Sequence, residues 1–326
     1  MRFTFVFPLF LLSATAWASE QSTLSLAVDN DGVFGVDRDY TSGVFINYTS
    51  AAITPSLSTK PLSLSLWGVN SIDKVGFTLG QKLYTPSNIS SSLAQVDQHP
   101  YAGYLYAEAN YLSINPNFAQ KFNITVGTTG KRSLAEDSQK FIHGITGSIE
   151  PQGWQYQVDN QWAGSVGYIA NSKIFRAPSV ANSDVELSNT SEVNAGNFRS
   201  NAATGFMLRW GENLADSLGA ANISSENPFN PGMLGASNSG WFLYTGVRAN
   251  YVFNDLTVEG DRSELPEPTS LYEVTLEHGQ NTAVAGFAAY TPFYGVNLSL
   301  SSNSKTYKES EHARSAIGGI TLFAFF

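Results

Sequence analysis

The sequence contains no cysteine, and charged residues make up only 14% of it, with a net charge of −9. The absence of cysteine excludes disulfide bonds and a thiol nucleophile, so packing and backbone pairing must hold the chain together. A negative net charge argues against the binding of nucleic acid through bulk electrostatics. We therefore expect no nucleic-acid partner.

Long apolar runs are also absent after the first residues, so no later segment could form a membrane-spanning helix of about 20 residues. The N-terminus has a basic start at Arg2, an apolar stretch over 3–12 and a small-residue pattern, Ala-Trp-Ala, that ends at Ala18. This pattern predicts a signal peptide that is cut after Ala18 and leaves residues 19–326 as one domain. The alternative is a buried N-terminal strand or helix.

Aromatic residues, at 13%, and 28 glycines are abundant for a chain with so few charges. Many segments alternate apolar and polar residues, as at Phe122, Ile124 and Val126, which is typical of strands with one apolar face. A soluble sandwich would show the same alternation. A membrane barrel also explains the composition, because its outer face is apolar, its interface girdles are aromatic and its inner face is polar.

The C-terminus distinguishes these two folds. Ile320, Leu322, Ala324 and Phe326 share one face of a last strand, and soluble proteins rarely end on such an apolar strand because it promotes aggregation. We therefore predict an all-β fold: a transmembrane antiparallel β-barrel of about twelve strands. We expect it to be a monomer in the outer membrane of a Gram-negative bacterium.

Twelve segments with alternating faces can be placed along the chain. They cover residues 24–31, 41–50, 73–83, 101–113, 118–129, 154–170, 183–195, 200–211, 240–254, 270–280, 283–302 (a strand flanking a turn) and 315–326. Residues 134–142 lack alternation and contain good helix formers, which predicts a short helix in an extracellular loop. Residues 212–239 are rich in Asn, Ser, Gly and Pro, which predicts a long irregular connection.

If both termini are periplasmic, the ends of the first strands and the predicted helix meet at the extracellular rim. The rim then gathers a set of candidate residues. They are Asn30, Asp31 and Thr41 from the first two strands, Gln81, Tyr84 and Tyr101 from the next two, which we expect to contact the substrate, and Gln139 and His143 from the helix. Rims are polar in any barrel, so position alone does not establish a site.

This set is chemically sufficient for ester hydrolysis. His143 can accept a proton from water near neutral pH, and Gln139, four residues earlier on the same helix face, can orient the water or the ester. Asn30, Asp31 and Thr41 offer oxygen ligands of the kind that Ca²⁺ prefers, and a bound cation would polarise the carbonyl. The sequence has no Gly-x-Ser-x-Gly elbow and no pair of histidines with zinc-protease spacing.

Further motifs follow one another along nearly the whole chain. They are Leu26–Asp31, Asp39–Gly43, Gln81–Pro86, Pro100–Tyr106, Gln139 with His143, Trp154, Gly196–Asn197, Gly211–Asp216 and Gly240–Gly246. At these residues the chain resembles the outer-membrane lipid A 3′-O-deacylase family. The ordered set is more specific than any single motif.

The resemblance implies a twelve-stranded barrel that removes the 3′ acyloxyacyl chain of lipid A, the membrane anchor of lipopolysaccharide, with Ca²⁺ as cofactor. It implies that His143 is the base that activates water and that Gln139 lies beside it. It also implies that Asn30, Asp31 and Thr41 form the calcium and oxyanion region. A rim site would meet such a substrate laterally, within the outer leaflet.

Two positions depart from the family pattern. The acidic residue expected six positions after the histidine is Ile149 here, with Glu150 one residue later, and a lysine is replaced within Ser90–Ser92. These departures leave open a barrel without catalysis that serves as a structural protein or a small-solute channel. A further alternative is a serine-type outer-membrane phospholipase, which would need an essential serine near His143, but the sequence has no recognisable nucleophile motif.

Overall fold

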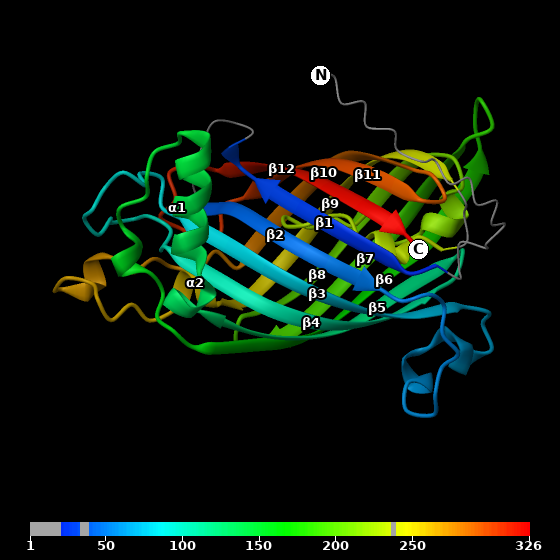
Figure 1. Ribbon diagram of the computed structural model, residues 1–326, viewed down its shortest axis with the longest axis horizontal. Coiled ribbons are helices and arrows are strands. Elements are labelled where there is room, and N and C mark those ends of the chain that lie inside the picture. Colours follow the sequence, from blue (N-terminus) through cyan, green and yellow to red (C-terminus); the bar gives the residue numbers. More distant parts are fainter. Residues whose placement is uncertain (1–20, 33–38, 236–238) are drawn as a thin grey trace, which may run out of the picture.

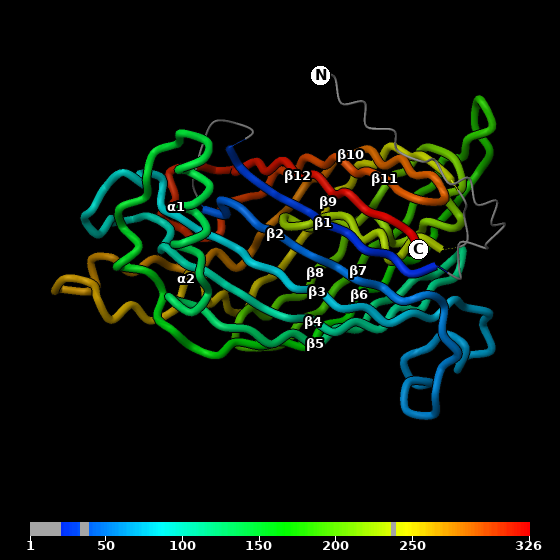
Figure 2. The backbone as a smooth tube through the Cα atoms, in the orientation of Figure 1, coloured from blue at the N-terminus to red at the C-terminus, as the bar shows by residue number. Residues whose placement is uncertain are grey.

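The computed structural model describes residues 21–32, 39–235 and 239–326. Within these ranges, twelve antiparallel strands form a closed barrel, and Figure 2 shows the blue first strand beside the red last one. The strands are β1 (Thr23–Asn30), β2 (Asp39–Thr49), β3 (Ile72–Thr85), β4 (Ala102–Ile114), β5 (Phe118–Thr129), β6 (Trp162–Pro178), β7 (Asp184–Gly196), β8 (Arg199–Gly211), β9 (Gly240–Asp255), β10 (Gly279–Tyr290), β11 (Tyr294–Ser304) and β12 (Arg314–Phe325). The predicted fold class is confirmed, and the predicted cleavage site at Ala18 lies outside the described residues.

The barrel wall is apolar outside and polar inside, the inverse of a soluble protein. In β1, Leu24, Leu26 and Val28 are exposed, whereas Ser25 and Asp29 point inward and are buried. Side chains of a strand alternate between its two faces, so each strand can present an apolar band outward. Pairing of β1 with β12 leaves no open edge, as a lipid environment demands.

No helix in the described ranges is long and apolar enough to cross a membrane. The longest helix is α1 (Ala135–Thr146). The remaining helical segments are α2 (Leu256–Glu259) and the 3-10 turns Lys60–Leu62, Leu64–Trp67, Gly130–Ser133, Trp154–Tyr156, Leu214–Ser217, Pro231–Met233 and Thr269–Leu271.

The predicted strand at 154–170 is a strand only from Trp162 onward. The residues before it include the 3-10 turn Trp154–Tyr156. Trp154 and Val158 are buried in two apolar clusters at the rim of the barrel. Gln157 is buried as well, so these loop residues do not have the alternating faces of a strand.

The predicted strand at 270–280 is wrong, because β10 begins at Gly279. Leu276 instead forms an isolated bridge with Tyr307 and packs in a small apolar cluster. The predicted segment 283–302 divides into β10 and β11. These two errors cancel, so the predicted number of strands is nevertheless right.

The helix α1 lies in the loop between β5 and β6, where the sequence predicts a helix over 134–142. It ends at Thr146 and is capped by Gly147, whose positive φ of 73° is a conformation that glycine adopts without strain. α1 packs on β3 and β4, and Figure 1 shows it lying across the strand ends farthest from the C-terminus. This end of the barrel, where β1 ends at Asn30 and β2 begins at Asp39, is termed the distal rim.

The connection between β8 and β9 is irregular, as predicted, and it folds into the barrel interior. Its described part, residues 212–235, is termed the plug. Plug residues such as Leu218 and Phe229 join inward-facing wall residues such as Phe242 and Met207 in the largest apolar cluster of the described chain. The chain itself therefore fills the part of the interior around this cluster.

Candidate active site

The helix α1 presents a buried polar face to the barrel wall. Gln139 and His143 are 3% and 8% exposed, and Ala135 on the same face is also buried. Their four-residue spacing aligns them along one side of the helix, as predicted. The opposite face carries Phe141 and Ile145, which are 66% and 68% exposed.

The strand register shows where α1 crosses the wall. Asn30 lies opposite Ser42, Ser42 opposite Leu83, and Leu83 opposite Gly103, which makes one row from β1 to β4. α1 begins above Gly103, since a Cβ atom there would lie 2.3 Å from the Cβ of Ala135. Only glycine permits so close an approach.

From this start, the helix extends across the neighbouring strands. The rise of an α-helix places His143 about 12 Å beyond Ala135, and the spacing of strands separates β4 from β1 by about 14 Å. α1 packs on β4 and β3 and lies across the strand ends (Figure 1). The same rim carries Asn30 and Thr41 on β1 and β2.

His143 is oriented by the main chain. Its Nδ1 atom lies 2.5 Å from the carbonyl oxygen of Ile149. A carbonyl can only accept a hydrogen bond, so Nδ1 carries the hydrogen and Nε2 of the neutral ring is an acceptor. Ile149 occupies the position at which the family pattern has an acidic residue, and the side chain of Glu150 is exposed.

Gln139 provides a buried donor. Its Oε1 accepts a hydrogen bond of 2.8 Å from the indole Nε1 of Trp154, which fixes the orientation of the amide. The Nε2 group of Gln139 is buried and has no hydrogen-bond partner within the described chain. A buried N–H group without a partner is energetically costly, so a ligand or water that accepts from it is favoured.

Asp31 and Thr41 meet where β1 and β2 end at the distal rim. The amide of Asp31 donates to the carbonyl oxygen of Thr41 at 3.1 Å, and the hydroxyls of Thr41 and Thr85 are 2.6 Å apart. Asn30 stabilises the same turn, because its Oδ1 accepts from the amide of Gly32 at 2.6 Å. The structure thus brings Asn30, Asp31 and Thr41 together.

These residues suit Ca²⁺ chemically, because their side chains offer oxygen atoms as ligands. The Asp31 carboxylate is 1% exposed. The described ranges hold no group of three or more His, Asp or Glu residues that could bind a metal. A cation at this rim would therefore depend on one carboxylate with neutral amide, hydroxyl and carbonyl oxygens.

The expected substrate contacts fall on two faces of the wall. Gln81 lies on the outer face and donates to the carbonyl of Ser133 at 2.7 Å, just before α1. Tyr101 packs on Trp154 with ring centroids 4.9 Å apart, so both support the floor of the site. Tyr84 lies on the lumenal face, since it lies three positions after Gln81 along β3.

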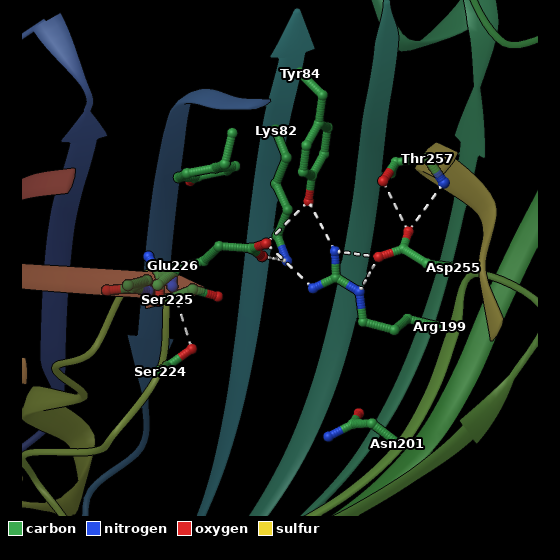
Figure 3. Close-up of polar contacts among 12 residues, drawn as sticks. Lys82, Tyr84, Arg199, Asn201, Ser224, Ser225, Glu226, Asp255 and Thr257 are labelled. Atoms are coloured by element: carbon green, nitrogen blue, oxygen red, sulfur yellow. Dashed lines mark hydrogen bonds and ion pairs between the residues drawn. The ribbon is translucent and has the colours of Figure 1, made fainter. Parts of the chain in front are cut away.

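A lumenal cluster, which sequence reasoning missed, lies behind the same strand ends (Figure 3). Glu226 from the plug pairs with Lys82 and Arg199, and it accepts a hydrogen bond of 2.9 Å from Tyr84. Burial alone would raise the pKa of Glu226, but the two cations hold this pKa at about 2. The only signal in the sequence is an isolated glutamate within the Ser- and Asn-rich residues 222–230.

Comparisons with known proteins agree with this architecture. A family model described as outer membrane protein LpxR matches residues 4–326. The solved structure of LpxR from Salmonella typhimurium has a TM-score of 0.76 at 16% identity and covers 93% of this chain and 100% of that chain. The β domain of the Bordetella autotransporter Brka has a TM-score of only 0.40 at 9% identity, over 94% of this chain and 97% of that chain. No curated protein sequence matches.

Proposed function

Because the chain belongs to the family of outer membrane protein LpxR, and so lies in the outer membrane of a Gram-negative bacterium, we propose that it is a lipid A 3′-O-deacylase. The observation that carries the proposal is the pair on the wall-facing side of α1. Nδ1 of His143 donates to a carbonyl, so Nε2 is the atom that can accept a proton. Gln139 has a buried N–H group with no hydrogen-bond partner among the described residues. The motif resemblance assigns catalysis to the same two residues.

In the proposed reaction, Nε2 of His143 takes a proton from a water molecule as the water oxygen attacks the ester carbonyl carbon. The bond between that carbon and the 3′ oxygen of the sugar then breaks, and Nε2 returns the proton to the sugar oxygen. The products are the free acyloxyacyl acid and an alcohol. The carbonyl of Ile149 keeps the ring in the required tautomer.

The negative charge that develops on the carbonyl oxygen needs a donor. Nε2 of Gln139 is proposed to supply it, because a preorganised donor in a buried place stabilises such a charge. Asn30, Asp31 and Thr41 would hold Ca²⁺, which polarises the ester carbonyl when bound. With a single carboxylate in the set, we expect weak calcium binding.

The position of α1 favours access from the membrane. The helix lies outside the wall, and its outward face carries exposed Phe141, Ile142 and Ile145. Acyl chains can pack on this face while their ester reaches the other side of the helix. We propose that lipid A enters sideways from the outer leaflet.

The channel alternative has less support, because the plug packs against the inner wall in an apolar cluster and so fills part of the interior. The serine-type phospholipase alternative would predict activity on plain phospholipid. Neither has an observation in its favour that the deacylase lacks.

The test is mass spectrometry of lipid A incubated with refolded protein, with calcium and with a chelator. We expect loss of the 3′ acyloxyacyl mass only with calcium, and no loss with His143→Ala. His312→Ala is the matched control, because His312 is exposed in another loop. Deacylation by the His143→Ala variant would overturn the assigned base, and an unchanged spectrum from the folded wild-type barrel would overturn the proposed function.

A further inference from the structure

The plug is anchored to the wall at both of its ends, far from its tip. Near its start, Arg209 donates to the carbonyl and hydroxyl of Ser217 at 2.8 and 2.9 Å. Near its end, the buried Nζ of Lys74 donates to the carbonyl of Leu234 at 3.1 Å. Between these anchors, the plug reaches the wall near the distal rim through Glu226 and Asn227, which are termed the tip.

The tip is bound to the barrel wall by ion pairs. Glu226 is buried and pairs with Lys82 on β3 and with Arg199 on β8, while Tyr84 on β3 donates to its other side (Figure 3). Arg199 is in turn fixed by Asp255 at 2.8 Å. Removing one member of such a buried group leaves uncompensated charge, so the arrangement resists displacement.

The next residue of the tip holds β1. The amide of Asn227 donates to Oδ2 of Asp29 at 2.5 Å, and the hydroxyl of Tyr40 donates to the same atom at 3.4 Å. Asn227 has a positive φ of 44°, which few residues other than glycine adopt. The contact with Asp29 therefore comes from a specifically shaped turn.

Three of the strand residues that the tip contacts are next in sequence to an outward-facing residue at the distal rim. Asp29 precedes Asn30 of the proposed calcium region, and Lys82 and Tyr84 flank Leu83, which lies beneath the start of α1. Adjacent strand residues point to opposite faces, so holding one in place constrains the other.

We propose that Glu226 and Asn227 are positioning residues for the rim site. They contact Asp29, Lys82 and Tyr84 from the lumenal side of the wall and so keep the outward-facing neighbours of these residues in place. The inference rests on the proposed function for its catalytic consequence. Its structural consequence, ordering of the ends of β1 and β2, can be measured without any substrate.

The experiment compares Glu226→Gln with Glu192→Gln in the full barrel. Glu192 forms another lumenal ion pair, with Arg248 at 2.8 Å, but it lies on β7, across the barrel from β1. Amide hydrogen exchange over 24–32 and 39–49 should become about tenfold faster in Glu226→Gln only. The calcium concentration for half-maximal deacylation should rise about tenfold in the same variant only, the usual effect of losing an outer-shell partner of a metal site.

Equal exchange in the two variants over these segments would overturn the positioning role, whether or not the wild type deacylates lipid A. If Glu226→Gln does not fold, Tyr84→Phe removes one hydrogen bond to Glu226 without leaving a buried charge, and it should shift both readouts in the same direction. Failure of the wild type to deacylate, with faster exchange in Glu226→Gln, would overturn the proposed function and leave the positioning of the strands supported.

Discussion

At the scale of single residues, the orientation of His143 depends on a main-chain carbonyl. The contact comes from Ile149, and the neighbouring Glu150 side chain is exposed. Exposed side chains outside a site contribute little, so Glu150→Gln should change kcat by less than about twofold. Steady-state deacylation assays can measure this. A loss of about 100-fold, the scale of a lost acid–base group, would show that Glu150 is the orienting group instead.

Asp31 supplies the only carboxylate among the proposed calcium ligands. Asp31→Asn should raise the calcium concentration needed for half-maximal activity by at least about tenfold. Folding should be unaffected, because Asp31 lies beyond the end of β1 and adds little to strand pairing. Asp73→Asn, at an equally buried aspartate on β3 far from the distal rim, is the control and should leave the calcium titration unchanged. Unchanged activity of Asp31→Asn at low calcium would count against this ligand.

The ionisation of Glu226 makes a definite prediction for pH. Its pKa is lowered from 4.5 to about 2, so its ion pairs contribute stability that is fully present above pH 4.5 and is lost as the pH falls towards 2. The difference in unfolding midpoint between the wild type and Glu226→Gln should be constant from pH 7 to about 5 and shrink toward zero near pH 2. Urea titrations across this range provide the measurement, and a difference that does not depend on pH would contradict the ion-pair account.

At the scale of elements, α1 separates two environments. Its inner face holds Gln139 and His143, and its outer face exposes Ile145 to the proposed lipid phase. Ile145→Asn should lower kcat/KM on membrane-embedded lipid A by about tenfold, because one apolar contact of this size contributes about 1.5 kcal/mol or more. Val247→Asn, on the outer face of β9, is the matched control. Equal activities of the two variants would mean that α1 does not contact substrate acyl chains.

At the scale of the whole molecule, the plug links the walls of the barrel. Glu186 on β7 is fully buried and pairs with both Arg176 and Arg209, the second of which also holds the plug. Glu186→Gln should lower the free energy of unfolding by about 3 kcal/mol or more, since two guanidinium groups lose their partner. Denaturant unfolding of the folded barrel measures this.

The control for that variant is Glu136→Gln. Glu136 pairs with Lys140 on the exposed side of α1, where solvent screens the charges, so its loss should cost less than about 0.5 kcal/mol. Similar losses in the two variants would mean that burial of the Glu186 group adds nothing to the stability of the barrel.

The barrel, its apolar closing strand and the helix that carries Gln139 and His143 can all be predicted from the sequence alone. These are local properties: period-two alternation and four-residue spacing are set by backbone geometry wherever the segment lies. The same local signal misplaced the strand at 270–280, because loop residues such as Leu276 that pack on one side copy the alternation of a strand. Motif order along the chain also identified the family correctly.

The face of the wall that each rim residue occupies, and what it contacts there, is known only from the folded chain. Gln81 and Tyr84 both lie near the end of β3, but one supports α1 outside and the other meets the plug inside. Two further contacts could not be predicted from the sequence: the carbonyl of Ile149 beside His143, and the ion pair of Glu226 with Lys82. Each depends on segments distant in the sequence or on a main-chain atom, and neither residue type nor spacing records where such atoms meet.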